Sequence, residues 1–210
     1  MIKFENTEVA GWEAAIRGMR NPLNSWEKSD SFEFPPDENG NPWIGLKDFN
    51  LMKRLRNAGT DHRKFMRMIT VYVDITAPLY WWKEFDTYKV GTVANSCSTM
   101  HKIAAKRFER DDFSHEHLMD GGNYILNSTI DMLNEYRAQY LDSKDKKYWW
   151  QIIQLLPSSY NQRRTVMLNY EVLANIYKSR RNHKLDEWRT MLDWIESLPY
   201  SELITGFGSF

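Results

Sequence analysis

The sequence has almost no cysteine and no excess of charge of either sign. Cys97 is the single cysteine among 210 residues, which excludes an intramolecular disulfide and suits a reducing compartment. Lysine plus arginine and aspartate plus glutamate both number 28, so the formal net charge is zero. A general nucleic-acid-binding protein normally shows a basic excess, so we expect no direct contact with nucleic acid.

Long apolar runs are also missing. No uncharged apolar stretch approaches the roughly 18 residues that a membrane-spanning helix requires. The first residues, from Met1 to Asn6, lack the charged and then apolar plan of a signal peptide. We therefore expect no membrane association and a cytoplasmic location.

Aromatic residues are abundant instead, at 14% of the chain. They favour large core and interface side chains, with stacking platforms for a flavin or a base as the alternative. The pairs Trp81-Trp82 and Trp149-Trp150 each place two rings about 100° apart on a helix, so one ring can be buried while the other meets an interface or cofactor. A neutral and aromatic surface favours self-association.

Hydrophobic periodicity predicts several helices and a few short strands. We expect helices over residues 7–20, 48–58, 79–85, 98–109, 123–141, 145–155, 170–181 and 185–197. We expect strands over 68–75 and 164–168, the first with four β-branched residues on one face: Ile69, Val71, Val73 and Ile75. Residues 21–46 are dense in turn signals and predict a long loop. No repeat or linker is visible, so we expect a single domain over residues 1–210.

Polar residues recur at a distinctive spacing in the last third of the chain. Asn169 lies twelve residues after Pro157, Asn175 follows six residues later, and Arg180 follows five residues after that. Carboxamides pair with the edges of uracil or isoalloxazine rings, and arginine offers a planar fork for a phosphate or a pyrimidine edge. The alternative is that Asn169 caps a helix and Arg180 is solvated.

The predicted helix places these three side chains on two faces. Asn169 and Arg180 are eleven residues apart, so they lie near one face and about 16 Å apart along the axis. Asn175 falls well off that face. A pocket within one chain would use one face, so this arrangement favours a site shared between subunits.

This spacing resembles the C-terminal signature of the flavin-dependent thymidylate synthases. The residues that match, with one residue fewer between the arginine and the glutamate, are Pro157, Asn169, Asn175, Arg180, Glu187 and Pro199. A second stretch, Asn95-Ser96-Cys97-Ser98, resembles the family segment in which an asparagine is followed three residues later by a substrate-binding serine.

The resemblance implies an α/β (α+β) fold with a small mixed sheet flanked by several helices, assembled as a homotetramer with shared sites. It implies that Arg180 is catalytic and polarises the dUMP base, that Asn169 and Asn175 bind FAD, and that Asn95 and Ser98 bind the substrate. The implied reaction transfers a one-carbon unit to C5 of dUMP, with methylene-tetrahydrofolate as donor and NADPH as reductant.

The chain departs from the family where the family is most basic. The Arg-His-Arg triplet is absent from the segment between Asp86 and Gly91, and Met100 and Ile153 stand where the family has arginines. Each lost arginine removes charged hydrogen bonds worth on the order of 1.5–3 kcal/mol. Candidate replacements are Lys83, Lys89, His101, Lys102, Arg163 and Arg164. A non-catalytic nucleotide-binding or protein-binding descendant is therefore the second hypothesis.

Two other groups of residues give weaker evidence for a functional site. His115 and His117 flank Glu116 in a charged turn, and spacing supplies no third ligand, so we predict no metal site. Cys97 has His101 four residues on, but a small packed residue is the preferred interpretation.

Overall fold

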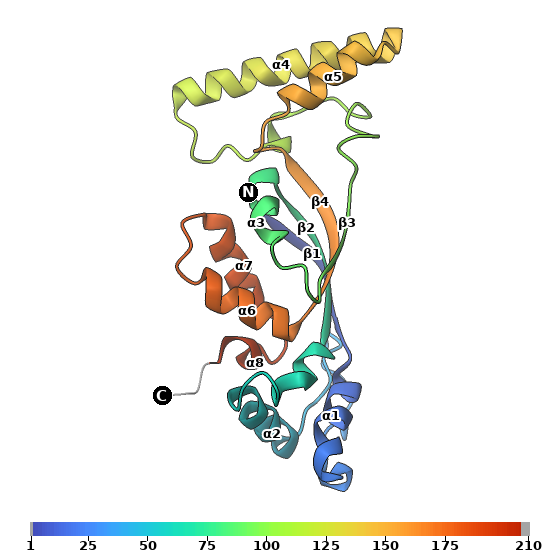
Figure 1. Cartoon of the computed structure of the whole chain (residues 1–210), viewed down its shortest axis with the longest axis vertical. Helices are drawn as coiled ribbons and strands as arrows, with labels where there is room; N and C mark the ends of the chain where they lie inside the picture. The colour runs from blue at the N-terminus through green and yellow to red at the C-terminus, as the bar shows by residue number, and fades with distance from the viewer. Residues whose placement is uncertain (1, 207–210) are drawn as a thin grey trace. The chain divides into compact units, whose positions relative to one another are not determined.

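The computed structural model describes residues 2–206, and Figure 1 shows the order of its elements. The strands are β1 (Lys3–Ala10), β2 (Thr70–Pro78), β3 (Val93–Ser96) and β4 (Asn161–Asn169). The helices are α1 (Trp12–Arg20), α2 (Leu46–Asn57), α3 (Leu79–Phe85), α4 (Asp120–Ser143), α5 (Lys146–Leu155), α6 (Tyr170–Arg180), α7 (Asp186–Glu196) and α8 (Glu202–Thr205). Within this part of the chain, no helix has the length and apolar character needed to span a membrane.

The four strands form one sheet in the order β1-β2-β4-β3. The backbone N–H of Tyr170 donates to Ile69, and that of Leu79 donates to Tyr160, so β2 and β4 run in opposite directions. The whole sheet is antiparallel. The predicted α/β class, with a small sheet and several helices, is confirmed, and on strand direction the structure shows an antiparallel rather than a mixed sheet.

The central strand β2 confirms the alternation read from the sequence. Ile69, which directly precedes β2, is fully buried, as are Val71, Val73 and Ile75 within it. Side chains two residues apart share one face of a strand, so this apolar face packs into the core. Pro78 ends the strand, and α3 begins at the next residue, as predicted.

The predicted helix over residues 7–20 is wrong in its first part. Residues up to Ala10 belong to β1, and α1 begins only at Trp12. Gly11 separates the two elements with a φ of 91°. A Cβ at this position would lie 2.1 Å from the carbonyl oxygen of Met68, so only glycine allows this approach.

The predicted helix over residues 98–109 is also wrong, because this segment forms turns. Side chains of α4 bind its backbone directly: Asn134 exchanges two hydrogen bonds with Phe108, at 2.8 and 2.9 Å, and Arg137 donates to the carbonyl of Ala104 at 2.9 Å. These tertiary contacts satisfy backbone groups that a helix would have paired internally. The preceding strand β3, which the sequence did not predict, pairs with β4.

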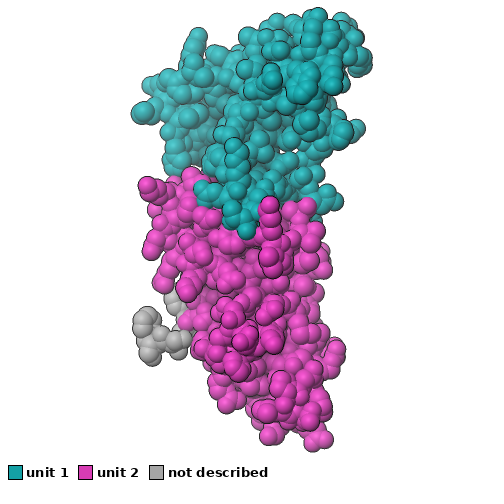
Figure 2. Space-filling model, viewed as in Figure 1, with its two compact units in different colours: residues 1–3, 75–87, 95–165 teal, residues 4–74, 88–94, 166–210 magenta. Residues whose placement is uncertain are grey.

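The chain forms two compact units, coloured separately in Figure 2. Unit 1 comprises Met1–Lys3, Ile75–Thr87 and Asn95–Thr165. Unit 2 comprises Phe4–Asp74, Tyr88–Ala94 and Val166–Phe210. The single domain over residues 1–210 stays a prediction.

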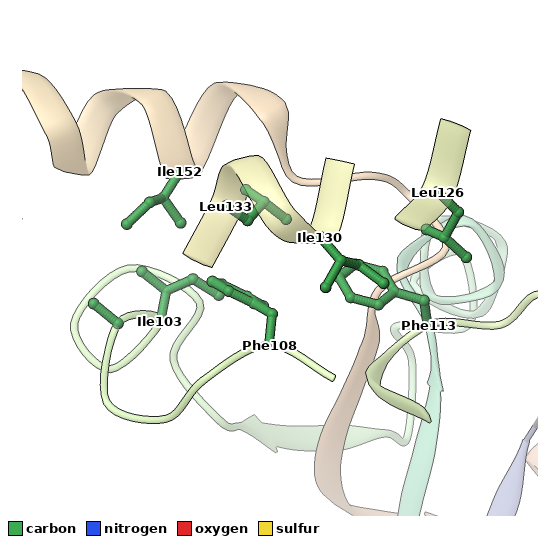
Figure 3. Packing of buried hydrophobic residues seen from close by; sticks show 8 residues of the cluster. Ile103, Phe108, Phe113, Leu126, Ile130, Leu133 and Ile152 are labelled. Carbon is green, nitrogen blue, oxygen red and sulfur yellow. The ribbon is translucent and has the colours of Figure 1, made fainter. Parts of the chain in front are cut away.

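The core of unit 1 lies between the helix pair α4 and α5 and the segment before them. Figure 3 shows apolar side chains from both helices directed at residues 103–113. The buried members are Ile103, Ala104, Phe108, Phe113, Leu126, Ile130, Leu133 and Ile152. Burial of this cluster explains why a segment without an α-helix keeps a defined path.

In unit 2, a buried ion pair fixes the long loop over residues 21–46. The Arg20 side chain, 4% exposed, binds the fully buried carboxylate of Asp48 at 2.6 Å. Ser29 and Ser31 donate to the same carboxylate at 2.6 and 2.7 Å. Burial raises the pKa of Asp48, but the hydrogen bonds from the two serines and Arg20 outweigh it and leave this pKa below its ordinary value. The loop is thus tied to α1 and α2 by a charge network.

Candidate functional site

Arg180, the predicted catalytic residue, is held by aromatic side chains at the C-terminal end of α6. Its Nε donates to the Tyr88 hydroxyl at 2.9 Å. The guanidinium carbon lies 4.5 Å from the centre of the Trp188 ring and 5.5 Å from that of Tyr88. The side chain is half-buried and oriented by cation–π contacts, so the interpretation as a fully solvated arginine does not describe it.

The ring beneath Arg180 is fixed in the core of unit 2. Trp188, on α7, is fully buried. It meets Tyr88 and His183 edge-on, at centroid distances of 6.1 and 6.0 Å. Sequence reasoning missed Tyr88 as a partner of Arg180, because 92 residues separate the two and no local pattern connects them. The one available signal was the position of Tyr88 within the segment that should carry the family's basic triplet.

Asn169 caps α6, as the alternative interpretation of the sequence predicted. Its Oδ1 accepts a hydrogen bond from the backbone N–H of Val172 at 3.0 Å, and the residue is 8% exposed. This bond fixes the orientation of the amide and leaves Nδ2 as a donor without a protein partner among the described residues. Gly91, with a φ of 78°, lies against Nδ2: a Cβ there would be 3.0 Å away.

Asn175 lies on α6 between Asn169 and Arg180, and its side chain is exposed. It makes no hydrogen bond with any residue that the structure describes. Buried apolar residues occupy the other side of the helix around it: Leu173, Ala174, Ile176 and Tyr177. One helix therefore carries all three polar residues, with Asn175 on the face that unit 2 leaves uncovered.

Asn95 and Ser98, the predicted substrate-binding residues, belong to unit 1. Asn95 is exposed on β3. The Ser98 Oγ accepts hydrogen bonds from the backbone N–H groups of Met100 and His101, at 3.2 and 2.9 Å, so it shapes the turn that follows β3. Its own hydroxyl hydrogen remains available to donate.

Arg164, one candidate replacement for the missing arginines, is paired within unit 1. Its Nη1 binds Asp86 at 2.7 Å, its Nε donates to Gln162 at 3.0 Å, and its guanidinium stacks on Trp82 at 4.1 Å. Asp86 opens the segment in which the family carries its basic triplet. The Asp86 carboxylate therefore neutralises the charge of the Arg164 guanidinium.

Among the described residues, the imidazole of His115 lies beside a backbone carbonyl and Cys97 is exposed. The Nδ1 of His115 lies 2.8 Å from the carbonyl oxygen of Phe113. Over the described residues, no group of three or more His, Cys, Asp or Glu side chains could hold a metal ion. Cys97 is an exposed free thiol, so its interpretation as a small packed residue is wrong.

No protein-family model and no curated protein matches this chain. Solved structures do. Thymidylate Synthase X (ThyX) from Helicobacter pylori, crystallised with FAD and dUMP, aligns with 97% of this chain and 95% of its own at 15% identity and a TM-score of 0.68. The UMP/dUMP methylase PolB from Streptomyces cacaoi, bound with 5-Br dUMP, aligns with 99% of this chain and 95% of its own at 14% identity and a TM-score of 0.63. The chain therefore has the fold of the flavin-dependent thymidylate synthase ThyX and of the UMP/dUMP methylase PolB.

Proposed function

We propose that this chain binds FAD and a pyrimidine deoxynucleotide and transfers a one-carbon unit to C5 of the pyrimidine. The observation that carries the proposal is the orientation of Arg180, whose guanidinium is held by the Tyr88 hydroxyl and the Trp188 ring. The fold supports it, because similar structures were solved with FAD and dUMP or with 5-Br dUMP.

In this proposal, Arg180 binds and polarises the pyrimidine ring. A guanidinium stays charged at any physiological pH and presents donors in a fixed plane that matches a carbonyl edge. Negative charge that develops on the ring as C5 becomes nucleophilic toward the one-carbon unit would be stabilised by this cation. Because aromatic contacts already orient the side chain, little reorganisation accompanies the reaction.

The asparagines of α6 fit a flavin in a specific way. The Nδ2 of Asn169 and the whole amide of Asn175 have no hydrogen-bond partner among the described residues, so they can pair with the carbonyl oxygens and ring nitrogens of an isoalloxazine. When bound, the flavin would supply hydride chemistry, and the protein would orient it. Asn95 and the Ser98 hydroxyl would contact the nucleotide substrate.

The proposal also includes a homotetramer, NADPH as reductant and methylene-tetrahydrofolate as donor. The exposed position of Asn175 supports a shared site, because a residue on the uncovered face of α6 can reach a ligand held by another subunit. The neutral net charge favours such association.

A second candidate function is a non-catalytic nucleotide-binding or protein-binding module. One observation favours it. Where the family has its basic triplet, this chain has Asp86 and Tyr88, and these residues bind Arg164 and Arg180. Two guanidinium groups that could meet an anionic ligand thus already have partners within their own units.

Spectroscopy of the purified protein tests the proposal. We expect flavin absorbance, and a rise in melting temperature when FAD or dUMP is added. Arg180→Ala should lower dUMP affinity or turnover by roughly 10- to 150-fold, because one charged hydrogen bond contributes about 1.5–3 kcal/mol. Lys178→Ala, an exposed residue of the same helix, serves as the control and should change neither.

The outcomes separate the two candidates. Colourless protein whose melting temperature responds to neither FAD nor dUMP removes the flavoenzyme. Nucleotide binding without turnover selects the non-catalytic module. If Arg180→Ala lowers stability as much as it lowers binding, Arg180 has a structural role only.

A further inference from the structure

Unit 1 contains a pocket that is lined by none of the residues predicted to bind FAD or the substrate, although His101, one candidate replacement for the missing arginines, lines it. It has a volume of about 480 Å³ and opens between the turn that joins α4 to α5 and the segment after β3. The side chains that give it chemical character are Met100, His101, Tyr140, Lys144, Lys146 and Trp149. This volume falls within the range of small-ligand sites, roughly 300–1,000 Å³.

The walls of the pocket are held in place by contacts within unit 1. The indole Nε1 of Trp149 donates to the carbonyl of Met100 at 3.1 Å, which fastens α5 to the segment that follows β3. Ile103, also in the lining, is buried in the hydrophobic cluster of Figure 3. Arg137 ties the neighbouring backbone to α4 through the Ala104 carbonyl. The cavity is therefore formed before any ligand arrives.

The rim of the pocket carries lysine charges that no described carboxylate neutralises. Lys144 and Lys146 make no ion pair with any described residue, and the lining that the structure describes contains no carboxylate. Lys146 lies over the rings of Trp149 and Trp150, at 5.9 and 5.7 Å, which holds its charge near the opening.

Asp145, the acidic residue between these two lysines, is engaged elsewhere. The Asp145 carboxylate accepts from the backbone N–H of Lys147 at 2.9 Å and pairs with its Nζ at 3.1 Å. Two lysines and the imidazole of His101 thus face a cavity without a local counter-charge. Such an arrangement attracts anions.

We propose that this pocket binds a nucleotide carrying at least two phosphate groups. The phosphates would lie among His101, Lys144 and Lys146, and the base would pack against Trp149 and Tyr140. Inorganic phosphate alone would leave most of the volume and both aromatic rings unused. The inference does not rest on the function proposed for Arg180, because Arg180 belongs to unit 2 and does not line the pocket.

Calorimetric titration of the full-length protein with ADP tests the inference. We expect Lys144→Asn/Lys146→Gln to weaken ADP binding at least tenfold. Asparagine suits position 144 because Lys144 has a φ of 57°, a conformation that asparagine tolerates. The matched control is Lys47→Asn/Lys53→Gln, which removes two exposed charges, one of them also stacked on an aromatic ring. It should leave ADP binding unchanged.

Ligands that lack one component of ADP test which part of the pocket binds the base and which binds the phosphates. Adenosine, which lacks phosphates, should bind at least tenfold more weakly than ADP, and inorganic pyrophosphate should also bind more weakly, because it lacks a base. The inference is overturned if ADP does not bind, if adenosine binds as tightly as ADP, or if both double variants retain wild-type affinity. Arg180→Ala should leave ADP affinity unchanged. If Arg180→Ala alone abolishes binding, ADP binds at Arg180 and the pocket does not bind this nucleotide.

Discussion

Unit 2 holds two arginines in opposite ways. Arg20 is enclosed, 4% exposed, with a fully buried carboxylate at 2.6 Å and further bonds to the backbone carbonyls of Ser25 and Lys28. Arg180 is half-buried and rests on the Trp188 ring, with its Nε on a phenol hydroxyl. Arg20 completes a hydrogen-bond network that holds the loop over residues 21–46. Arg180 is positioned by aromatic rings while part of its side chain stays accessible.

This difference indicates that Arg20 serves the stability of the fold and that Arg180 is suited to ligand recognition. An enclosed ion pair with added hydrogen bonds supports the fold, because breaking it leaves an uncompensated charge in the interior. A guanidinium on an aromatic ring keeps its charge at lower desolvation cost, which suits a ligand-binding role. The comparison predicts large stability effects around Arg20 and small ones around Arg180.

The largest effect is expected for Asp48→Ala. This change leaves Arg20 buried without its carboxylate and should lower the free energy of unfolding by about 3–5 kcal/mol. Chemical denaturation measures it. Glu13→Ala is the control, because the Glu13–Arg17 pair lies exposed on the same helix as Arg20 and should cost less than about 1 kcal/mol. Equal losses in both variants would contradict the comparison.

Acid should weaken the same network by a smaller amount. The pKa of Asp48 is lower in the folded state than its ordinary value, so its contribution to stability is present above about pH 4 and is lost as the pH falls further. Denaturation series at pH 7, 4 and 3 should show a drop below pH 4 that is reduced in Asp48→Asn. An unchanged pH profile in that variant would assign acid sensitivity to other carboxylates.

Asn169→Ala tests both roles of one amide. Loss of the N-cap should lower the free energy of unfolding by about 1 kcal/mol. Under the proposed function it should also weaken FAD binding. Asn175→Ala should weaken FAD binding with little change in stability, because its side chain bonds to no residue that the structure describes. If Asn169→Ala lowers stability but leaves FAD affinity intact, Asn169 is a cap only.

Tyr88→Phe should give a small stability change, about 0.5–1.5 kcal/mol, because it removes one hydrogen bond to Arg180 and keeps the ring. The proposed function predicts a larger effect on dUMP binding than on the melting temperature. A variant with unaltered nucleotide binding would show that the Trp188 ring alone orients Arg180.

Local patterns predicted most helices well, but they predicted only two of the four strands in the described part of the chain and missed β1 and β3. The helices from residue 123 to 197 and the strand before α3 lie within a few residues of their predicted bounds. The failures, at residues 7–10 and 98–109, have tertiary causes. Gly11 approaches the Met68 carbonyl, and α4 side chains bind the backbone of the segment after β3. Neither contact leaves a periodic mark in the sequence.

The candidate sites were predictable only in part. The spacing on α6 identified Asn169, Asn175 and Arg180, and it raised helix capping by Asn169 as an alternative, which is confirmed. The aromatic partners of Arg180 were not foreseen. Nor was the basic pocket of unit 1, although lysines next to the Trp149-Trp150 pair are visible in the sequence. Whether such lysines are neutralised depends on where Asp145 points.

The sequence by itself determined the class of fold and the positions of most elements, because burial of apolar side chains imposes periods of two and of about 3.6 residues. It also determined which helix carries the amides and the guanidinium. Only the tertiary structure decided which charges are enclosed and which remain accessible. That distinction depends on contacts between residues such as Tyr88 and Arg180, far apart in the chain, whose energies have no local signature.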